Sequence, residues 1–408
     1  MEAEMALTKG ALLEELVREY FVRQGYFVLR SVPFQFDGDD VTDVDVWLYS
    51  RQAASARVRA IVDVKNKKSP KAFERVLWVK GLQAALGCDR AFIATTDVNP
   101  KLTRFAQSQQ IAVLSKGILE RLEKKLSVDD RLTLEEFLGL VQSYPAQKQD
   151  GDWIRLVSQA KAALASRSGF PAFNTTIAAF RFFAERAEMR VQYRDVALRS
   201  ALLCAALACI ALDTALERLV FEDGDRRFDG LMRGVCYGDT GDGKMLANIS
   251  DALAVLSEGL PNGRAIAAQA RAQFDQRIAA LRAEIIAEHF AREHNAQHLF
   301  GVAKELDDAA HARVIGGKPL SVEARSVLGV FADFVGVKRS VLPMRGEVTP
   351  DAAVAAALQS SPDASRANRL AEKRLAASKK IQRHLAGGAT GAEATGAKDL
   401  EDDQPPLL

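Results

Sequence analysis

The sequence has little of what holds small extracellular proteins together. Its 408 residues include only four cysteines, and no two of them form a Cys-x-x-Cys pair. This spacing argues against a zinc ribbon or a disulfide scaffold and is typical of a protein in a reducing cytosol. The first residues are acidic and lack the basic and apolar segments of a secretory signal. We therefore expect a cytoplasmic protein.

Long apolar runs and an excess of one charge are also missing. The most apolar run, residues 201–212, is much shorter than the roughly 20 residues that span a bilayer, so it predicts a buried helix and no membrane partner. Lysine and arginine (55) nearly balance aspartate and glutamate (53), which gives a formal net charge of +2. Any surface that binds nucleic acid must therefore be a local patch.

The first third of the chain alternates between strand and helix patterns. Apolar residues recur at helical spacing over residues 8–24, and Gly25 follows as a stop signal. The pattern then predicts strands over 26–33, 41–49 and 59–65, a helix over 71–86, a strand over 91–95, a helix over 100–109 and a strand over 111–114. Residues 50–59 are expected to form a loop. This order favours a partly parallel sheet covered by helices.

Two of the predicted strands carry charged residues on one face. Because side chains alternate along a strand, Asp43 and Asp45 share a face of the second strand, and Asp63 and Lys65 share a face of the third. A carboxylate beside an ammonium group at a strand end can hold a metal ion and a water molecule together. An ordinary ion pair on an edge strand is the structural alternative.

The first helix contributes a further acid. At 100° per residue Glu14 lies at the border of the apolar stripe, whereas Glu15 and Glu19 are expected on the solvent side. Glu14 is therefore the acid of this helix that is best placed to face the interior of the domain. A solvated helix acid is the alternative interpretation.

Residues 8–118 resemble the PD-(D/E)XK nuclease superfamily, and within it the branch of Mrr-like restriction endonucleases and Holliday-junction resolvases. The matching segments are 10–14 with Gly25-Tyr26 downstream, Thr42-Asp43-Val44-Asp45-Val46, Val62-Asp63-Val64-Lys65, and 87–96 followed by 111–114. Each motif alone is common, but the ordered set of acid helix, acid strand and Asp-x-Lys strand is more specific. The resemblance covers less than a third of the chain.

The resemblance implies an α/β restriction-endonuclease-like domain, a mixed sheet flanked by helices, with a defined set of site residues. Asp45 would match the first metal-binding acid, Asp63 the second, Lys65 the catalytic lysine and Glu14 the acid of the first helix. Asp43 is the alternative for the first acid. The second acid is more often glutamate in this branch, so Asp63 departs from the pattern and reaches less far by one methylene.

The implied chemistry is hydrolysis of a phosphodiester bond with a bound Mg²⁺, for which Mn²⁺ can substitute. Lys67, Lys68 and Lys71 follow the third strand and could contact the DNA backbone, and a solvated turn is the alternative. Gln83, on the following helix, is a further candidate DNA contact or an ordinary exposed polar residue.

The remaining two thirds of the chain predict a different organisation. We expect a nuclease-like domain over 1–126, a connecting helix and polar linker over 127–152, an all-helical domain over 153–345, a loose basic helical segment over 346–386 and a disordered acidic tail over 387–408. The connecting helix is expected over residues 126–142, within the region before the polar linker. The helical domain would recognise substrate, a protein partner or a second copy of the chain.

These observations together predict a Mg²⁺-dependent DNA endonuclease in prokaryotic restriction or anti-phage defence. Three alternatives stay open. The first is a repair or recombination nuclease with the same fold, and the second is a non-catalytic DNA-binding or assembly protein on a degenerate nuclease fold. The third is a scaffold whose function lies wholly in the helical part. DNA is the expected partner of the nuclease interpretations and of the DNA-binding alternative.

Overall fold

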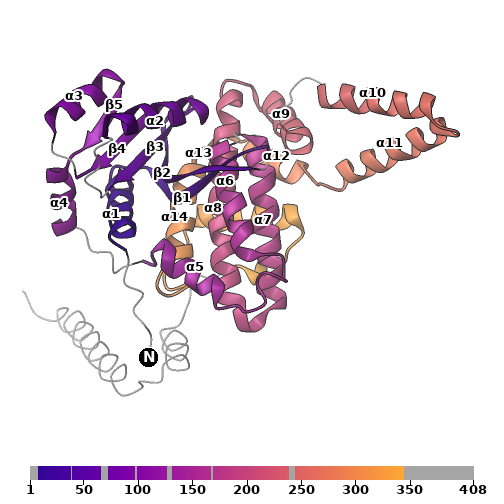
Figure 1. Ribbon diagram of the computed structural model, residues 1–408. Coiled ribbons are helices and arrows are strands. Elements are labelled where there is room, and N and C mark those ends of the chain that lie inside the picture. Colours follow the sequence, from indigo (N-terminus) through magenta and orange to yellow (C-terminus); the bar gives the residue numbers. More distant parts are fainter. Residues whose placement is uncertain are drawn as a thin grey trace, which may run out of the picture. The chain divides into compact units, whose positions relative to one another are not determined.

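The computed structural model describes residues 8–37, 39–65, 72–96, 99–125, 131–166, 169–238 and 244–343 (Figure 1). The predicted basic segment over 346–386 and the predicted tail over 387–408 lie outside the described residues, as do Lys67, Lys68 and Lys71. All of the described residues belong to the compact unit that ends at Glu347.

A mixed sheet of five strands forms the N-terminal part. The strands are β1 (Phe27–Phe36), β2 (Asp39–Ala53), β3 (Ala56–Lys65), β4 (Arg90–Thr95) and β5 (Ile111–Leu114). They lie in the order β1-β2-β3-β4-β5, with antiparallel pairing up to β3 and parallel pairing from β3 to β5. The predicted partly parallel sheet is therefore confirmed.

Helices cover both faces of this sheet (Figure 1). They are α1 (Lys9–Arg23), α2 (Ala72–Ala85), α3 (Pro100–Ser108) and α4 (Lys116–Lys125). Apolar residues of α1 and α4 pack with Val28, Leu48 and Val62 on one face. Residues of α2 and α3 belong to the core cluster that contains Ile61 and Ile93 on the other face.

The prediction of a loop over residues 50–59, between the second and third strands, is wrong. β2 continues to Ala53 and β3 begins at Ala56, so a tight turn joins them. Pairs Ser50↔Val58 and Arg51↔Arg57 extend the antiparallel ladder through the residues expected to form a loop. The arginine side chains of this extension have buried partners in the helical part, which the local sequence pattern does not reveal.

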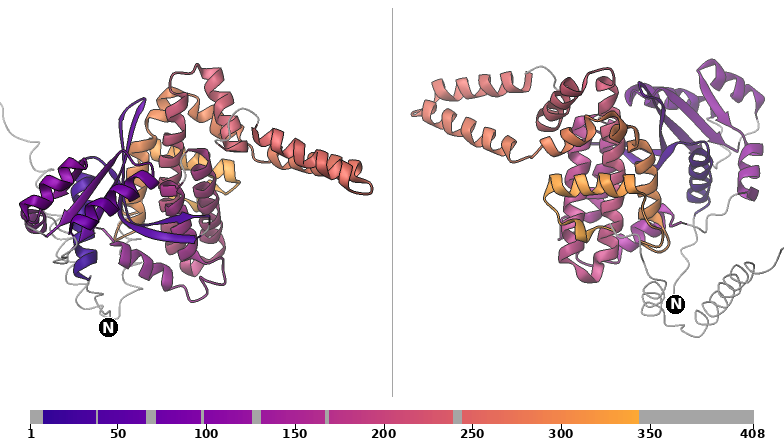
Figure 2. Two further views of the ribbon diagram at one scale, coloured as in Figure 1. Left: turned by 45° about the horizontal axis from the view of Figure 1, so that its top comes forward. Right: turned by 180° about the vertical axis from the view of Figure 1, so that it is seen from behind.

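Every regular element described after β5 is helical, as predicted. The elements after α4 are α5 (Leu134–Gln142), α6 (Trp153–Ser166), α7 (Phe170–Met189), η1 (Val191–Tyr193), α8 (Arg194–Leu216), η2 (Glu217–Leu219), α9 (Gly224–Tyr237), α10 (Lys244–Gly259), α11 (Gly263–Ala279), α12 (Glu284–Phe290), α13 (Glu293–Gln297), α14 (Leu299–His311), α15 (Val322–Val335) and η3 (Arg339–Val341). α10 and α11 form an antiparallel pair that projects from the other helices in each view (Figure 2). The connecting helix begins at Leu134, later than predicted, because Thr133 and Glu136 form a capping box there.

The apolar run 201–212 lies within α8 and is fully buried, which confirms that prediction. By length and composition the helical stretch Val191–Leu219 could cross a membrane, but 94% of its most apolar 18-residue window is buried inside the protein. It is the central helix of the helical part, an arrangement consistent with a soluble protein.

The sheet and the helical part share one hydrophobic core. The cluster that contains Trp47 and Ile61 of the sheet also contains residues of α6, α7, α8 and α14. The predicted linker forms turns, and Trp153 directly after it is fully buried against Tyr144 and Phe183. A domain boundary at residue 152 would therefore cut through one continuous hydrophobic core. That the two parts fold independently stays a prediction.

A buried carboxylate links the two parts by hydrogen bonds. Asp213 of α8 is 0% exposed and accepts a hydrogen bond of 2.6 Å from the Tyr49 hydroxyl of β2. It also accepts from Arg51 Nη1 at 3.0 Å and from Arg57 Nη2 at 3.1 Å. A buried charge is costly unless it is paired and hydrogen-bonded, so these three contacts fix how the β2–β3 turn meets α8.

We predict that Asp213→Asn lowers the free energy of unfolding by about 3–5 kcal/mol, because it leaves two arginines with an uncompensated buried charge. Urea unfolding followed by circular dichroism measures this. Asp229→Asn, an exposed aspartate of α9, is the control and should change stability by less than about 0.5 kcal/mol. Equal stability of the two variants would contradict the role given to Asp213.

Candidate active site

The candidate site lies where β2 and β3 separate. Val46↔Val62 is the last backbone pair of their ladder on this side. The next residue of β2, Asp45, accepts the Val64 N–H with its side chain, from Val64 N to Asp45 Oδ2 at 2.7 Å. A carboxylate thus takes the place of a backbone carbonyl, and the two strands diverge at a pair of acids.

Asp63 and Lys65 occupy the end of β3 at this divergence. β3 stays paired with β4 through Asp63↔Ile93 and Lys65↔Thr95, so its end is held on that side only. The register of β2 and β3, extended by one residue beyond Val46↔Val62, brings Asp45 opposite Asp63. The three charged residues predicted from the sequence are therefore neighbours in space.

The pKa of the Asp45 carboxyl also depends on the nearby charges of Asp63 and Lys65. Burial raises the pKa of its carboxyl to about 6, and the negative charges of Asp63 and Glu14 add to this rise. The hydrogen bond from Val64 N–H and the charge of Lys65 oppose it. Asp45 consequently changes protonation state close to neutral pH, and a nearby cation would favour its ionised form.

Arg75 of α2 is the part of the site that the sequence did not indicate. Its Nε donates to Asp63 Oδ2 at 2.8 Å, its Nη2 donates to Asp63 Oδ1, and its guanidinium lies over the Trp78 ring, 4.1 Å from the centroid. Asp63 is only 5% exposed, so this bidentate pair supplies the charge balance that a buried carboxylate needs. No local motif distinguishes Arg75 from other arginines on a helix.

Glu14 points toward the site but is shared with another cation. Glu14 Oε2 accepts from Arg30 Nη2 of β1 at 3.1 Å, and the same guanidinium contacts Glu135 of α5 at 2.9 Å. Its charge still acts on Asp45. The predicted fourth acid is thus near the site and held by Arg30.

The prediction that Glu15 faces solvent is wrong. Glu15 is buried and binds Arg18 and Arg30, whose charges outweigh the effect of burial and lower the pKa of its carboxyl. The side of α1 away from its apolar stripe is covered by Arg30 of β1, Arg131 before α5 and Asp307 of α14. This arrangement is decided by parts of the chain far from α1 in sequence.

Two other predicted residues lie elsewhere. Asp43 is exposed, and its charge acts on Lys161 of α6, where it raises the lysine pKa against the larger effect of burial. Gln83 donates to the carbonyl oxygens of Cys88 and Asp89, at the end of α2 that leads into β4. The structure thus brings Asp45, and not Asp43, to Asp63, and it gives Gln83 contacts that stabilise a turn.

The donor set fits a small hard cation. The described residues contain no group of three or more His, Cys, Asp or Glu side chains placed to hold one ion. Mg²⁺ keeps several waters and is commonly bound by one or two protein carboxylates. Asp45 and Asp63 can supply these oxygens, although Asp63 must share its oxygens with, or turn from, Arg75.

Comparisons with protein-family models, curated proteins and solved structures found no match to this chain. The functional assignment therefore rests on the residues of the site and their geometry.

We predict that Asp45→Asn stabilises the ion-free protein by about 2–3 kcal/mol at about pH 8 and by about half as much at about pH 5. The folded-state pKa of about 6 exceeds the ordinary value of 3.8, so the wild-type protein loses stability as the pH rises through this interval. The amide oxygen can still accept the Val64 N–H.

Urea unfolding in EDTA at both pH values measures the difference. Asp43→Asn, an exposed carboxylate two residues earlier on β2, is the control and should show no such pH dependence. An Asp45→Asn variant that is no more stable than the wild type at pH 8 would show that Asp45 is not in the environment described.

Proposed function

We propose that the protein is a Mg²⁺-dependent DNA endonuclease whose active site is formed by Asp45, Asp63 and Lys65. The observation that carries this proposal is the divergence of β2 and β3 at two opposed carboxylates with a lysine two residues further along β3. The resemblance of residues 8–118 to PD-(D/E)XK nucleases adds support, since the mixed sheet and flanking helices have the order expected for that fold.

Each residue has a separate task in this proposal. Asp45 and Asp63 supply carboxylate oxygens to the ion, which when bound would polarise the phosphate and lower the pKa of a bound water. Lys65 places a positive charge beside the attacking water and the phosphate, where it stabilises the negative charge that develops in the transition state. Glu14 is held by Arg30 and can accept a hydrogen bond from a water at the site.

Arg75 has a positioning role. In the ion-free protein its guanidinium neutralises Asp63, which would otherwise repel Asp45 across the divergence. An arriving cation competes with Arg75 for the same carboxylate. The guanidinium also lies over the Trp78 ring, and this contact would still hold Arg75 when Asp63 turns to the ion.

Restriction or anti-phage defence is the setting that the resemblance favours. A repair or recombination nuclease would use the same site, and the two differ in the DNA they cut. The rival from another class, a non-catalytic DNA-binding protein, is disfavoured by the intact set of two acids and a lysine, because opposed buried carboxylates cost stability without an ion.

We predict that Asp45→Asn and Asp63→Asn each lower Mg²⁺-dependent cleavage of supercoiled DNA by about 100-fold or more, because each removes an anionic ligand of the ion. Asp43→Asn, the matched control, should cleave at the wild-type rate. Conversion of supercoiled to nicked and linear plasmid, with Mg²⁺, Mn²⁺ or EDTA, measures the rates. Absence of cleavage on supercoiled, linear, single-stranded and branched DNA would reject the enzymatic proposal.

We predict that Lys65→Ala lowers the single-turnover rate at saturating protein by about 100-fold or more while DNA affinity changes little, since its charge acts mainly in the transition state. Lys65→Arg should not restore the full rate, because a planar guanidinium cannot replace a compact ammonium. A Lys65→Ala variant with a normal saturated rate, weaker binding and a shallower salt dependence would make Lys65 a backbone contact.

A further inference from the structure

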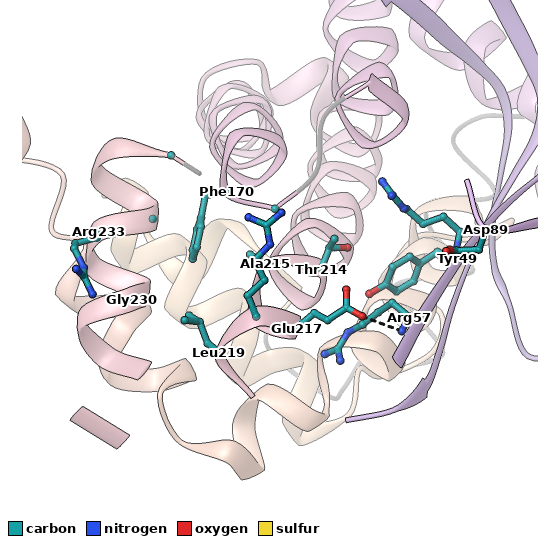
Figure 3. Close-up of a pocket in the computed structure, with 15 residues that line it drawn as sticks. Tyr49, Arg57, Asp89, Phe170, Thr214, Ala215, Glu217, Leu219, Gly230 and Arg233 are labelled. Atoms are coloured by element: carbon teal, nitrogen blue, oxygen red, sulfur yellow. Dashed lines mark hydrogen bonds between the residues drawn. The ribbon is translucent and has the colours of Figure 1, made fainter. Parts of the chain in front are cut away.

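A cavity of about 350 Å³ lies between the sheet and the helical part (Figure 3). Its walls come from β2, β3, the start of α7, the end of α8 with η2, and α9. Figure 3 shows Tyr49 and Arg57 of the sheet on one side and Gly230 and Arg233 of α9 on the other. The volume falls within the range of about 300–1,000 Å³ that is usual for small-molecule sites.

Positive charge dominates the lining. Four arginines contribute to it, Arg57 and Arg59 from β3, Arg218 from η2 and Arg233 from α9, against the two carboxylates of Asp89 and Glu217. Both carboxylates accept hydrogen bonds from β3 backbone N–H groups, Asp89 Oδ2 from Arg59 N at 2.7 Å and Glu217 Oε1 from Arg57 N at 3.3 Å. Arg57 is also paired with Asp213, so the excess of positive charge rests on Arg59, Arg218 and Arg233 against these two carboxylates, which are in part committed to the strand.

Several of the arginine donors are unused. The Arg57 side chain is 3% exposed, and its Nε has no hydrogen-bond partner among the described residues. Arg218 and Arg233 are exposed to solvent. Arg218 makes no hydrogen bond or ion pair with the described part of the chain, and Arg233 Nε donates to the Asp229 carbonyl at 3.3 Å. A buried guanidinium with an unsatisfied donor beside a cavity is the arrangement that an anionic ligand would complete.

Glycines keep the helices that enclose the cavity close together. A Cβ at Gly234 would lie 2.1 Å from Phe170 Cε2, and one at Gly230 would lie 2.7 Å from Leu219 Cδ2. These glycines bring α9 against the start of α7. Gly169 caps α7 without a side-chain hydrogen bond, so this end of a 20-residue helix adds partial positive charge to the wall.

We propose that this cavity binds a small phosphorylated ligand of the size of a mononucleotide. The arginines on opposite walls would bind its phosphate groups, and the cavity would enclose the remainder of the molecule. A small ligand is favoured over a nucleic-acid strand because the arginines line several walls of one pocket of limited volume and do not follow a track.

The cavity is distinct from the candidate active site. Arg59 precedes Asp63 by four residues of β3, which separates their Cα atoms by about 13 Å along the strand. The binding proposal therefore does not depend on nuclease activity and is tested by binding alone.

Isothermal titration of the full chain in EDTA with inorganic pyrophosphate, AMP, ATP and a short single-stranded oligonucleotide tests the proposal. We predict saturable binding of at least one of the three small phosphates. Arg218→Glu should lower that affinity by about tenfold or more, the loss expected for a charge-assisted contact. Arg155→Glu, with the same charge change on an exposed residue of α6 outside the cavity, should bind as the wild type.

Three results would overturn the proposal. One is the absence of saturable binding of all three small phosphates at millimolar concentrations. Another is an equal loss of affinity in Arg218→Glu and Arg155→Glu, which would indicate a general charge effect. The third is binding of the oligonucleotide alone with sensitivity to Arg218→Glu, which would make the cavity part of a nucleic-acid path. Circular dichroism of each variant confirms folding.

Discussion

The burial of Asp213 is the constraint on which the rest of the structure depends. A buried carboxylate in an apolar helix must be neutralised, and the partners of Asp213, near the C-terminal end of α8, are Tyr49, Arg51 and Arg57 of the β2–β3 hairpin. The hairpin therefore continues through residues that the sequence predicted to form a loop, and it lies against α8. This contact fixes the sheet to the helical part, and the arginine-lined cavity forms beside it.

The C-terminal end of β3, at Asp63 and Lys65, has the opposite electrostatic requirement to its start at Arg57. At Asp213 the acidic and basic groups are paired with one another. At the divergence of β2 and β3, two carboxylates lie close together, and Arg75 is the cation that balances Asp63. The raised pKa of Asp45 is the energetic sign of this arrangement. Burial of like charges is unfavourable in the protein alone and favours binding of a cation. β3 thus connects a structural ion cluster to a candidate catalytic one.

Much of the fold was predictable because periodicity is local. The strands and helices up to β5 were placed within a few residues of their observed bounds, except for the longer β2–β3 hairpin, whereas α4 was not predicted. Alternation along the strands also placed Asp45 and Asp63 correctly enough to bring them together. The errors at the hairpin and at Glu15 have one cause. Both depend on charged partners outside the element itself, Asp213 of α8 for the hairpin and Arg30 of β1 for Glu15.

The sequence by itself determined which elements form, that the central apolar helix is buried, and which acids and lysine can meet at a strand end, since these follow from side-chain spacing. The tertiary structure decided which charged side chains are neutralised and which residues neutralise them. Arg75 on Asp63, Arg30 on Glu14 and the hairpin arginines on Asp213 are set by packing. The physical reason is that burial makes every charge find a partner, and that partner is chosen by position in space and not by position in the chain.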